Sequence, residues 1–549
     1  MELYTMTNHN YVFGEGGTGL RILLALYQIM SSRAYAKKGA TENYKQVYET
    51  MDAGAEEIEE LKKLLKADKD MKFNDPAYFL AFLKLAERVK DMLAKDKTMS
   101  LEKIAPEWFR NELLLTREEL LRDLLGGYYR DLVLGSVVSA VAMRCALETE
   151  EDKKAGFQAV IDDVVASNNT YEVRVAFAGS GIGGEGRTNI CARPAMLKSL
   201  CIERVMEDLK MQQEQAKAYV ERNLKIAVVM VGSAFRFPAI KGLDQDVAGL
   251  VAGTLRNFPD DSAEAVNLMY LLEHDCCPVQ ASQPSDSGEQ HKHAHAIELV
   301  AVSCIENFFH RDTESASKKQ CPVFPHYSMP GRTLTNWENL GLPEEYRINL
   351  SARLRFDAAL FYWVRPQLMV TPEERNAGKL YESEILARMF KAKTPKQVEE
   401  SIYASGLDLD QDILKPLRAL LEKETMYLKY LRDICLTGKN WETGAMPSPD
   451  CSTDLFDVSR IEHMLTKNPS ISDFGGMTGF KLDELTMCPK NKITGTEEDS
   501  LYHTKLTMDK LRNRITYNKN GKPRAFREIL NEIYDICSER KEKKRYGIF

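Results

Sequence analysis

Several features that would place this chain in a special class are missing from its sequence. None of its 11 cysteines lies in a CxxC pair, so neither a zinc ribbon nor a disulfide framework is indicated, and reduced thiols of a cytoplasmic protein are expected. No window offers about 18 uncharged apolar residues, and Met1 to Asn10 hold no basic segment followed by an apolar stretch. We therefore expect no membrane span and no export signal.

A strong charge of one sign is also missing. The sequence has 74 Lys and Arg against 81 Asp and Glu, a formal net charge of −7, which is too weak to hold nucleic acid or an anionic membrane. Only residues 501–549 are basic, with 13 Lys and Arg against 6 Asp and Glu. Nucleic acid is thus an expected partner only through this tail, whose simpler interpretation is a solvated helix with a basic end.

Two common catalytic motifs are absent. Neither glycine-rich loop ends in the Gly-Lys-Ser/Thr of a P-loop, and Ser180 has Ala178 and Ile182 where a nucleophile elbow needs glycines. No catalytic residue is assigned from the sequence.

What is present fits a large globular protein. The 549 residues are 44% hydrophobic and 28% charged, and they exceed the size of a single core. β-prone runs at 11–13, 171–178 and 224–231 alternate with helical patterns, which predicts an α/β fold with a mostly parallel sheet and flanking helices.

The patterning along the chain predicts four regions. An α/β domain takes residues 1–33 and 131–312, and the charged helical pattern of residues 34–130 predicts a helical insert. Residues 313–436 read as a second, mainly helical domain, and residues 437–549 as an irregular segment followed by the basic helical tail.

Two glycine-rich loops, each between a predicted strand and a helix, are the strongest functional signal. Glycine lets backbone N–H groups approach an anion, and the helix N-terminus behind it adds a partial positive charge. The first loop consists of Gly14, Glu15, Gly16, Gly17, Thr18 and Gly19; the second contains Gly179, Ser180, Gly181, Gly183, Gly184 and Gly186, followed by Arg187, Thr188 and Asn189. Both predict phosphate binding, while tight turns, helix packing and helix capping are the structural alternatives.

A dinucleotide is one ligand that such loops bind. The GxGxxG of Gly14, Gly16 and Gly19 suits NAD(P), but the sequence predicts no second strand with a terminal acidic residue in residues 31–50. An NAD(P)-dependent Rossmann oxidoreductase is therefore kept as an alternative.

The order of these features resembles the tubulin/FtsZ-like nucleotide-binding domain, most closely its divergent bacterial members. The resemblance rests on a GxGGTG loop opening a helix, a second glycine-rich loop, a buried strand and a long apolar helix, and it covers residues 8–312. It implies a tubulin-like or Rossmann-like fold that binds GTP or GDP in both loops, with His295 and Glu298 of the central helix facing the nucleotide or a domain contact.

The second loop reads GIGGEG where the family has GGTGSG, and its Glu185 suits a triphosphate only if Mg²⁺ intervenes. The loop after the central helix matches that of polymerising members poorly, so a weak NTPase activity is left open. The resemblance implies a cytoplasmic homo-oligomer, or a protein partner, controlled by the nucleotide. A non-catalytic interaction protein is the remaining alternative.

A histidine cluster, His291, His293 and His295, offers imidazoles that could bind Zn²⁺ or Ni²⁺. Its position between a polar loop and a helix favours exposed histidines with one pointing inward. We assign no metal site from the sequence.

Overall fold

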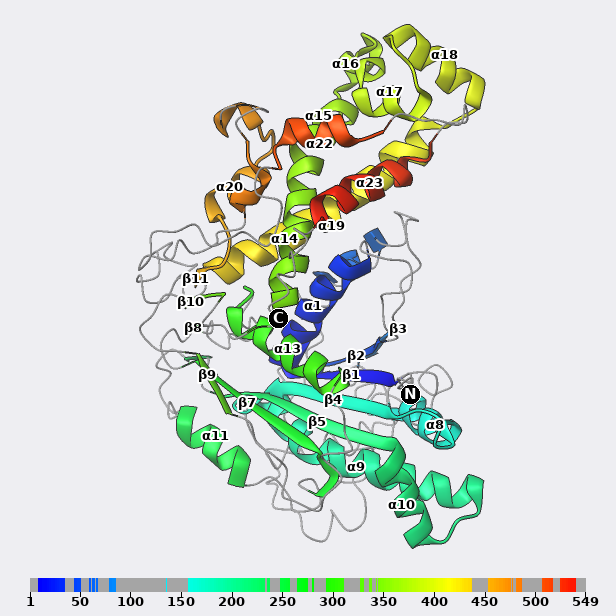
Figure 1. Ribbon diagram of the computed structural model, residues 1–549. Coiled ribbons are helices and arrows are strands. Elements are labelled where there is room, and N and C mark those ends of the chain that lie inside the picture. Colours follow the sequence, from blue (N-terminus) through cyan, green and yellow to red (C-terminus); the bar gives the residue numbers. More distant parts are fainter. Residues whose placement is uncertain are drawn as a thin grey trace, which may run out of the picture.

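The chain forms a parallel sheet between two layers of helices, with a mainly helical region beyond one layer (Figure 1). The computed structural model describes residues 8–34, 44–50, 79–84, 157–232, 247–256, 264–274, 293–310, 344–436, 453–474, 480–485, 506–516 and 524–539, with short pieces at 59–60, 62–64, 66–67, 135, 235–236, 279–280, 326–329, 335–337, 342 and 476.

The sheet has seven strands in the order β3-β2-β1-β4-β5-β7-β9, and every neighbouring pair is parallel. The strands are β1 (His9–Glu15), β2 (Tyr44–Thr50), β3 (Phe79–Lys84), β4 (Val173–Ser180), β5 (Leu224–Val231), β7 (Leu268–His274) and β9 (His326–Met329). Every residue of β4 and β5 is buried, as expected of parallel strands covered on both faces.

Helices lie on both faces of this sheet. On one face, α1 (Gly16–Ala34) and α13 (Ala296–His310) pack against the central strands. On the other face lie α8 (Phe157–Ser167), α9 (Gly184–Leu209) and α10 (Gln213–Asn223), with α11 (Val247–Arg256) beside them in Figure 1. The predicted α/β class is thereby confirmed.

The prediction of a purely helical insert at residues 34–130 is wrong in two places. Residues 44–50 form β2, which pairs in parallel with β1, and residues 79–84 form β3, which pairs with β2. The sequence YKQVYET of β2 mixes charged and polar residues with aromatics, so no apolar run marks it as a strand. Hydrogen bonds from the neighbouring strands, rather than local pattern, hold it in the sheet.

The predicted domain boundary at residue 312 does not coincide with the end of the sheet, because β9 adds a strand after it. Helices follow, and they agree with the predicted helical character of residues 313–436. They are α14 (Glu344–Ala359), the π-helical turn η4 (Leu360–Val364), α15 (Arg365–Leu368), α16 (Pro372–Asn376), the 3-10 turn η5 (Lys379–Glu382), α17 (Glu384–Phe390), α18 (Pro395–Ser405), the π-helical turn η6 (Asp410–Leu414) and α19 (Lys415–Cys435).

The remaining described elements are short strands, short helical pieces and one longer helix. Two two-stranded ribbons occur, β6 (Phe235–Arg236) with β8 (Val279–Gln280) and β10 (Thr335–Asn336) with β11 (Thr453–Asp454). The helical pieces are α20 (Val458–Met464), η8 (Ile471–Phe474), η9 (Leu482–Leu485), α22 (Met508–Arg514) and α23 (Phe526–Ser538).

Helix α23 is not the solvated terminal helix that the sequence favoured. It packs against α14 and buries an apolar face that includes Phe526, Ile529 and Ile533, and Tyr534 meets Phe356 edge-on at 5.7 Å between ring centroids. The apolar residues of α23 have the spacing of an amphipathic helix, so one face of the helix is buried although the surrounding sequence is basic. The basic end at residues 541–545 lies outside the described residues.

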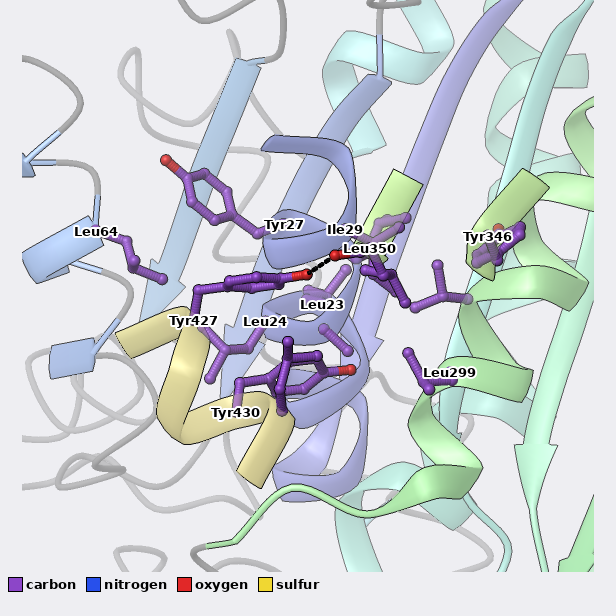
Figure 2. Packing of buried hydrophobic residues seen from close by; sticks show 14 of the residues in the cluster. Leu23, Leu24, Tyr27, Ile29, Leu64, Leu299, Tyr346, Leu350, Tyr427 and Tyr430 are labelled. Carbon is purple, nitrogen blue, oxygen red and sulfur yellow. Dashed lines mark hydrogen bonds between the residues drawn. The ribbon is translucent and has the colours of Figure 1, made fainter. Parts of the chain in front are cut away.

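A buried ion pair joins the helical region to α1. The Arg353 guanidinium on α14 donates from Nε to Glu424 Oε2 on α19 at 2.7 Å and from Nη1 to the carbonyl of Gln28 at 2.7 Å. Both charged side chains are fully buried. Figure 2 shows the surrounding contact, in which Tyr427 lies beside Tyr27 of α1 and donates its hydroxyl to the Leu350 carbonyl at 3.2 Å. Helix α1 therefore packs between the sheet on one side and helices α14 and α19 on the other.

Candidate functional site

The strand order reverses direction between β1 and β4. From β1 the chain continues to β2 on one side, whereas from β4 it continues to β5 on the other side. In open α/β sheets the crevice at such a switch point, outside the carboxyl ends of the strands, is the usual ligand site. Both glycine-rich loops follow these two strands, so the sequence motifs and the topology single out the same place.

The two loops are in direct contact, as the prediction of a shared site requires. A Cβ added at Gly16 would lie 3.0 Å from the backbone nitrogen of Gly186, and one added at Gly179 would lie 3.0 Å from the Glu15 carbonyl oxygen. Gly16 also has φ +67°, a left-handed conformation that favours glycine. Glycines at these positions thus allow the close approach of two backbones far apart in sequence.

Glu15, the last residue of β1, clamps the first loop to α9. Its Oε1 accepts from Arg193 Nη1 at 3.1 Å, and its Oε2 accepts from the Asn189 amide at 2.7 Å. Both charged side chains are completely buried. Burial raises the pKa of Glu15, and the charge of Arg193 and the hydrogen bond from Asn189 act in the opposite direction. The Glu15 carboxylate therefore has internal partners and does not face the crevice between the loops.

The second loop is shorter than predicted, because α9 begins at Gly184, so Gly186, Arg187, Thr188 and Asn189 already belong to the helix. Thr188 is consequently a helical residue whose hydroxyl donates to the Gly184 carbonyl at 2.8 Å. The Ser180 hydroxyl accepts from the Ile182 backbone N–H at 3.2 Å. Together with Asn189, these predicted ligand contacts have partners within the protein.

Four predicted residues are partly exposed where the loops meet the solvent. They are Gly17 and Thr18 at the start of α1, and Gly183 and Gly184 at the start of α9; the neighbouring Gly14, Gly19, Gly181 and Gly186 are buried. The first turn of a helix leaves N–H groups without intrahelical acceptors, and the glycine N-cap of α9 supplies no side chain to accept one. These turns are suited to hydrogen bonding with an anion.

Arg187 stands in the first turn of α9 and is 9% exposed. Its Nε has no hydrogen-bond partner in the part of the chain that the structure describes. Arg193, two turns further along the same helix, is paired with Glu15. The two buried arginines of α9 thus differ sharply in how their charge is compensated.

His295 and Glu298, predicted at the start of the central helix, cap that helix. The Ile297 backbone N–H donates to His295 Nδ1 at 3.0 Å, and the His295 backbone N–H donates to Glu298 Oε1 at 3.1 Å. Arg21 of α1 also donates to Glu298 Oε1, at 3.2 Å. These bonds lie at the start of α13 and between α13 and α1, which both belong to the predicted α/β domain, so the predicted nucleotide or domain contact stays a prediction.

The histidine cluster does not converge on one point. His293 Nδ1 lies 3.0 Å from Asp433 Oδ2, whereas His295 caps α13, and His291 lies outside the described residues. Over the described ranges, no group of three or more His, Cys, Asp or Glu side chains is placed to hold a metal ion.

Sequence reasoning missed two arginines and a threonine at this site. Arg193 and Arg21 hold Glu15 and Glu298, and the Thr254 hydroxyl of α11 donates to the Gly181 carbonyl at 2.7 Å. The position of Arg193 four residues after Asn189 places both on one face of α9, which is the only local signal. Their partners are remote in sequence, so the pairs could not be derived from spacing.

Within the described residues, every helix is too short or too polar to cross a bilayer. No family model matches this sequence, and no curated protein or solved structure is detectably similar to it.

Proposed function

We propose that this protein binds a phosphate-bearing nucleotide, GTP or GDP, in the crevice between the two glycine-rich loops. The observation that carries the proposal is the meeting of both loops at the switch point between β1 and β4. The residues that would contact the phosphates are the partly exposed Gly17, Thr18, Gly183 and Gly184, together with Arg187.

Electrostatics support an anionic ligand at this place. Helices α1 and α9 both begin here, so the positive ends of two helix dipoles point toward the same crevice. A phosphate could accept hydrogen bonds from the first-turn N–H groups of both helices. Glu185 in the first turn of α9 carries the opposite charge, so we propose that Mg²⁺ accompanies a triphosphate.

The guanine nucleotide is proposed from the tubulin-like order of elements. Two loops that follow the first and fourth strands, a buried fifth strand and the helix α13 after β7 are consistent with that order. We propose that nucleotide occupancy controls self-assembly or contact with a protein partner. Hydrolysis is not part of the proposal, because no catalytic group has been identified in the site.

The direct test is to identify what the purified protein carries. Denaturing the protein and separating the released compounds by anion-exchange chromatography should yield GTP or GDP. Titration calorimetry of stripped protein, with and without Mg²⁺, should then show binding of guanine nucleotides. Protein that carries no nucleotide and binds none would refute the proposal.

Substitutions at Gly183 test the location of the site. A Cβ at Gly183 meets nothing closer than the Ser180 Cβ at 3.9 Å, and its φ of −74° suits any residue. Gly183→Ala should therefore fold and bind almost normally. Gly183→Trp should also fold but fill the crevice and weaken binding at least about 10-fold. Equal affinity of the two variants would exclude this place as the site.

A dinucleotide is the second candidate, because the structure contains the strand that the sequence did not predict. Dinucleotide-binding sheets place an acidic residue at the end of the second strand. In β2 this position is held by Glu49, whose Cα is paired in register with Glu15. Release of NAD(P) instead of a guanine nucleotide would favour the oxidoreductase.

The assembly part of the proposal has its own measurement. Sedimentation velocity of the stripped protein with and without GTP and Mg²⁺ should reveal larger species in the presence of nucleotide. Identical profiles would remove self-assembly and leave a heterologous partner.

A further inference from the structure

Among the residues that the structure describes, none supplies a counter-charge to Arg187. Only 9% of Arg187 is exposed, and its Nε makes no hydrogen bond to the described residues. None of the ion pairs formed by those residues includes it, although Glu185 is only two positions away. Burying an unpaired guanidinium is costly, so a buried arginine normally has a carboxylate or an external anion beside it.

Helix geometry indicates which surface the guanidinium serves. A helical side chain lies over the turn N-terminal to its own Cα, and for Arg187 this turn is formed by Gly183 and Gly184. The Arg187 N–H donates to the Gly183 carbonyl at 3.0 Å, which confirms that these residues share a turn. Both glycines are partly exposed, so solvent reaches this turn.

Helix α11 forms the other side of the same surface. Arg187 Nη2 lies 3.6 Å from the position that a Cβ on Gly253 would take, and Gly253 is itself partly exposed. Thr254 fixes α11 here, because its hydroxyl donates to the Gly181 carbonyl and its own carbonyl accepts from Cys191 Sγ at 3.9 Å. We call the surface formed by Gly183, Gly184, Arg187, Gly253 and Thr254 the α9–α11 flank.

The Cys191 thiol on α9 lies close enough to the Arg187 charge to be influenced by it. Burial raises the pKa of Cys191 to about 12, and the charge of Arg187 acts in the opposite direction. Cys191 is one turn after Arg187 on α9, so both side chains lie on the side of the helix that faces α11.

We propose that the α9–α11 flank binds a phosphate group and that Arg187 is its counter-charge. A guanidinium donates in a fork that matches phosphate oxygens, and the N-terminal turn of α9 adds backbone N–H groups beside it. The inference rests on the proposed function in one respect: the phosphate is taken to belong to the bound nucleotide. Arg187 then makes the site discriminate phosphorylated ligands from the bare nucleoside.

The test compares the two buried arginines of α9 by thermal unfolding. Wild type, Arg187→Met and Arg193→Met are unfolded with inorganic pyrophosphate and with NaCl at matched ionic strength. Pyrophosphate should raise the Tm of wild type, and Arg187→Met should lose this response. Without pyrophosphate, Arg187→Met should unfold at the wild-type temperature or above, because it removes an uncompensated charge, whereas Arg193→Met should unfold earlier.

Calorimetry with GTP and guanosine identifies the source of the phosphate. Arg187→Met should weaken GTP binding about 10- to 100-fold and leave guanosine binding unchanged. GTP binding that is indifferent to Arg187→Met would overturn the inference while leaving nucleotide binding intact. A pyrophosphate response that needs Arg187, in a protein that binds no nucleotide, would support the inference and refute the proposed function. The absence of any pyrophosphate effect in wild type beyond that of NaCl would also overturn the inference.

Discussion

Arg193 and Glu15 form an ion pair of 3.1 Å between α9 and the end of β1, and neither side chain is exposed. The pair joins the first glycine-rich loop to the helix that follows the second. Because both loops depend on this contact for their relative position, it is structural support for the candidate site and not a part that a ligand would touch.

Removal of Arg193 should therefore be strongly destabilising. Arg193→Met leaves the Glu15 carboxylate buried without its cation, and the expected loss in free energy of unfolding is about 3 to 5 kcal/mol. Urea denaturation followed by circular dichroism measures it. The double variant Arg193→Met with Glu15→Gln should recover part of the loss; a double variant no more stable than the single one would contradict a specific pairing.

The glycines of the loops should fall into two classes when replaced by alanine. A Cβ at Gly19 would lie 2.4 Å from the Ala178 carbonyl oxygen, so Gly19→Ala should cost about 1 to 3 kcal/mol through overpacking. Gly183→Ala has open space and should change stability by less than about 0.5 kcal/mol. Chemical denaturation of both variants checks the difference, and equal costs would show that close backbone packing does not govern these positions.

The acidic pair beside Arg353 should make stability depend on pH. Burial, and then the charge of Glu424, raise the pKa of Asp357 well above its ordinary value, while the charge of Arg353 acts in the opposite direction. Burial opposes ionisation of Glu424, but the charge of Arg353, its hydrogen bond to Glu424 and the charge of Lys423 act together in the opposite direction, and the pKa of Glu424 is lowered. Asp357 thus keeps a proton in the folded state at a pH where it has lost it in the unfolded state.

The sign of the pH effect follows from this proton. The folded state binds one more proton than the unfolded state above about pH 4, so the contribution of Asp357 to stability falls as pH rises from there toward its folded pKa. The contribution of Glu424 has the opposite sign and is lost only as pH falls below about 4. Asp357→Asn should therefore gain stability relative to wild type between about pH 5 and 8.

Urea unfolding of wild type and Asp357→Asn over this range provides the measurement. Asp410→Asn is a suitable control, because Arg375 lowers the pKa of this exposed carboxylate and it is ionised in both states above pH 5. A difference between wild type and Asp357→Asn that does not vary with pH would contradict the raised pKa of Asp357.

Helix α23 should behave as part of the core despite the basic character of its region. Ile533 is fully buried, and Ile533→Ala should cost about 2 to 5 kcal/mol. Glu528→Ala, an exposed position on the same helix, should cost less than about 0.5 kcal/mol. If both variants melted like wild type, α23 would not be packed against α14.

The local sequence pattern was sufficient to predict a secondary-structure element where all residues of the segment are buried. The run LKIAVVMV predicts a strand with the bounds that β5 has, because all eight residues are buried. The glycine-rich loops likewise mark the switch point, because glycine allows the two loop backbones to approach each other closely there.

Pairs that are distant in sequence were not predictable. Nothing near Glu15 indicates that its partner is Arg193, and nothing in residues 44–50 indicates that they pair with β1. The predicted roles of Asn189 and Thr188 depended on the directions of their side chains. Because α9 begins at Gly184, both residues are helical and their side chains bond to Glu15 and to the Gly184 carbonyl.

The parallel arrangement of β1 and β4 has a consequence for the nascent chain on the ribosome. β1 is complete at Glu15 and its neighbour β2 follows at Tyr44, but its other neighbour, β4, begins only at Val173, so one edge of β1 waits for roughly 8 to 30 s of elongation before that partner exists. β9 closes the far edge later still. During synthesis the first glycine-rich loop therefore emerges long before the second loop that packs against it, and one edge of β1 stays without its strand partner over that interval.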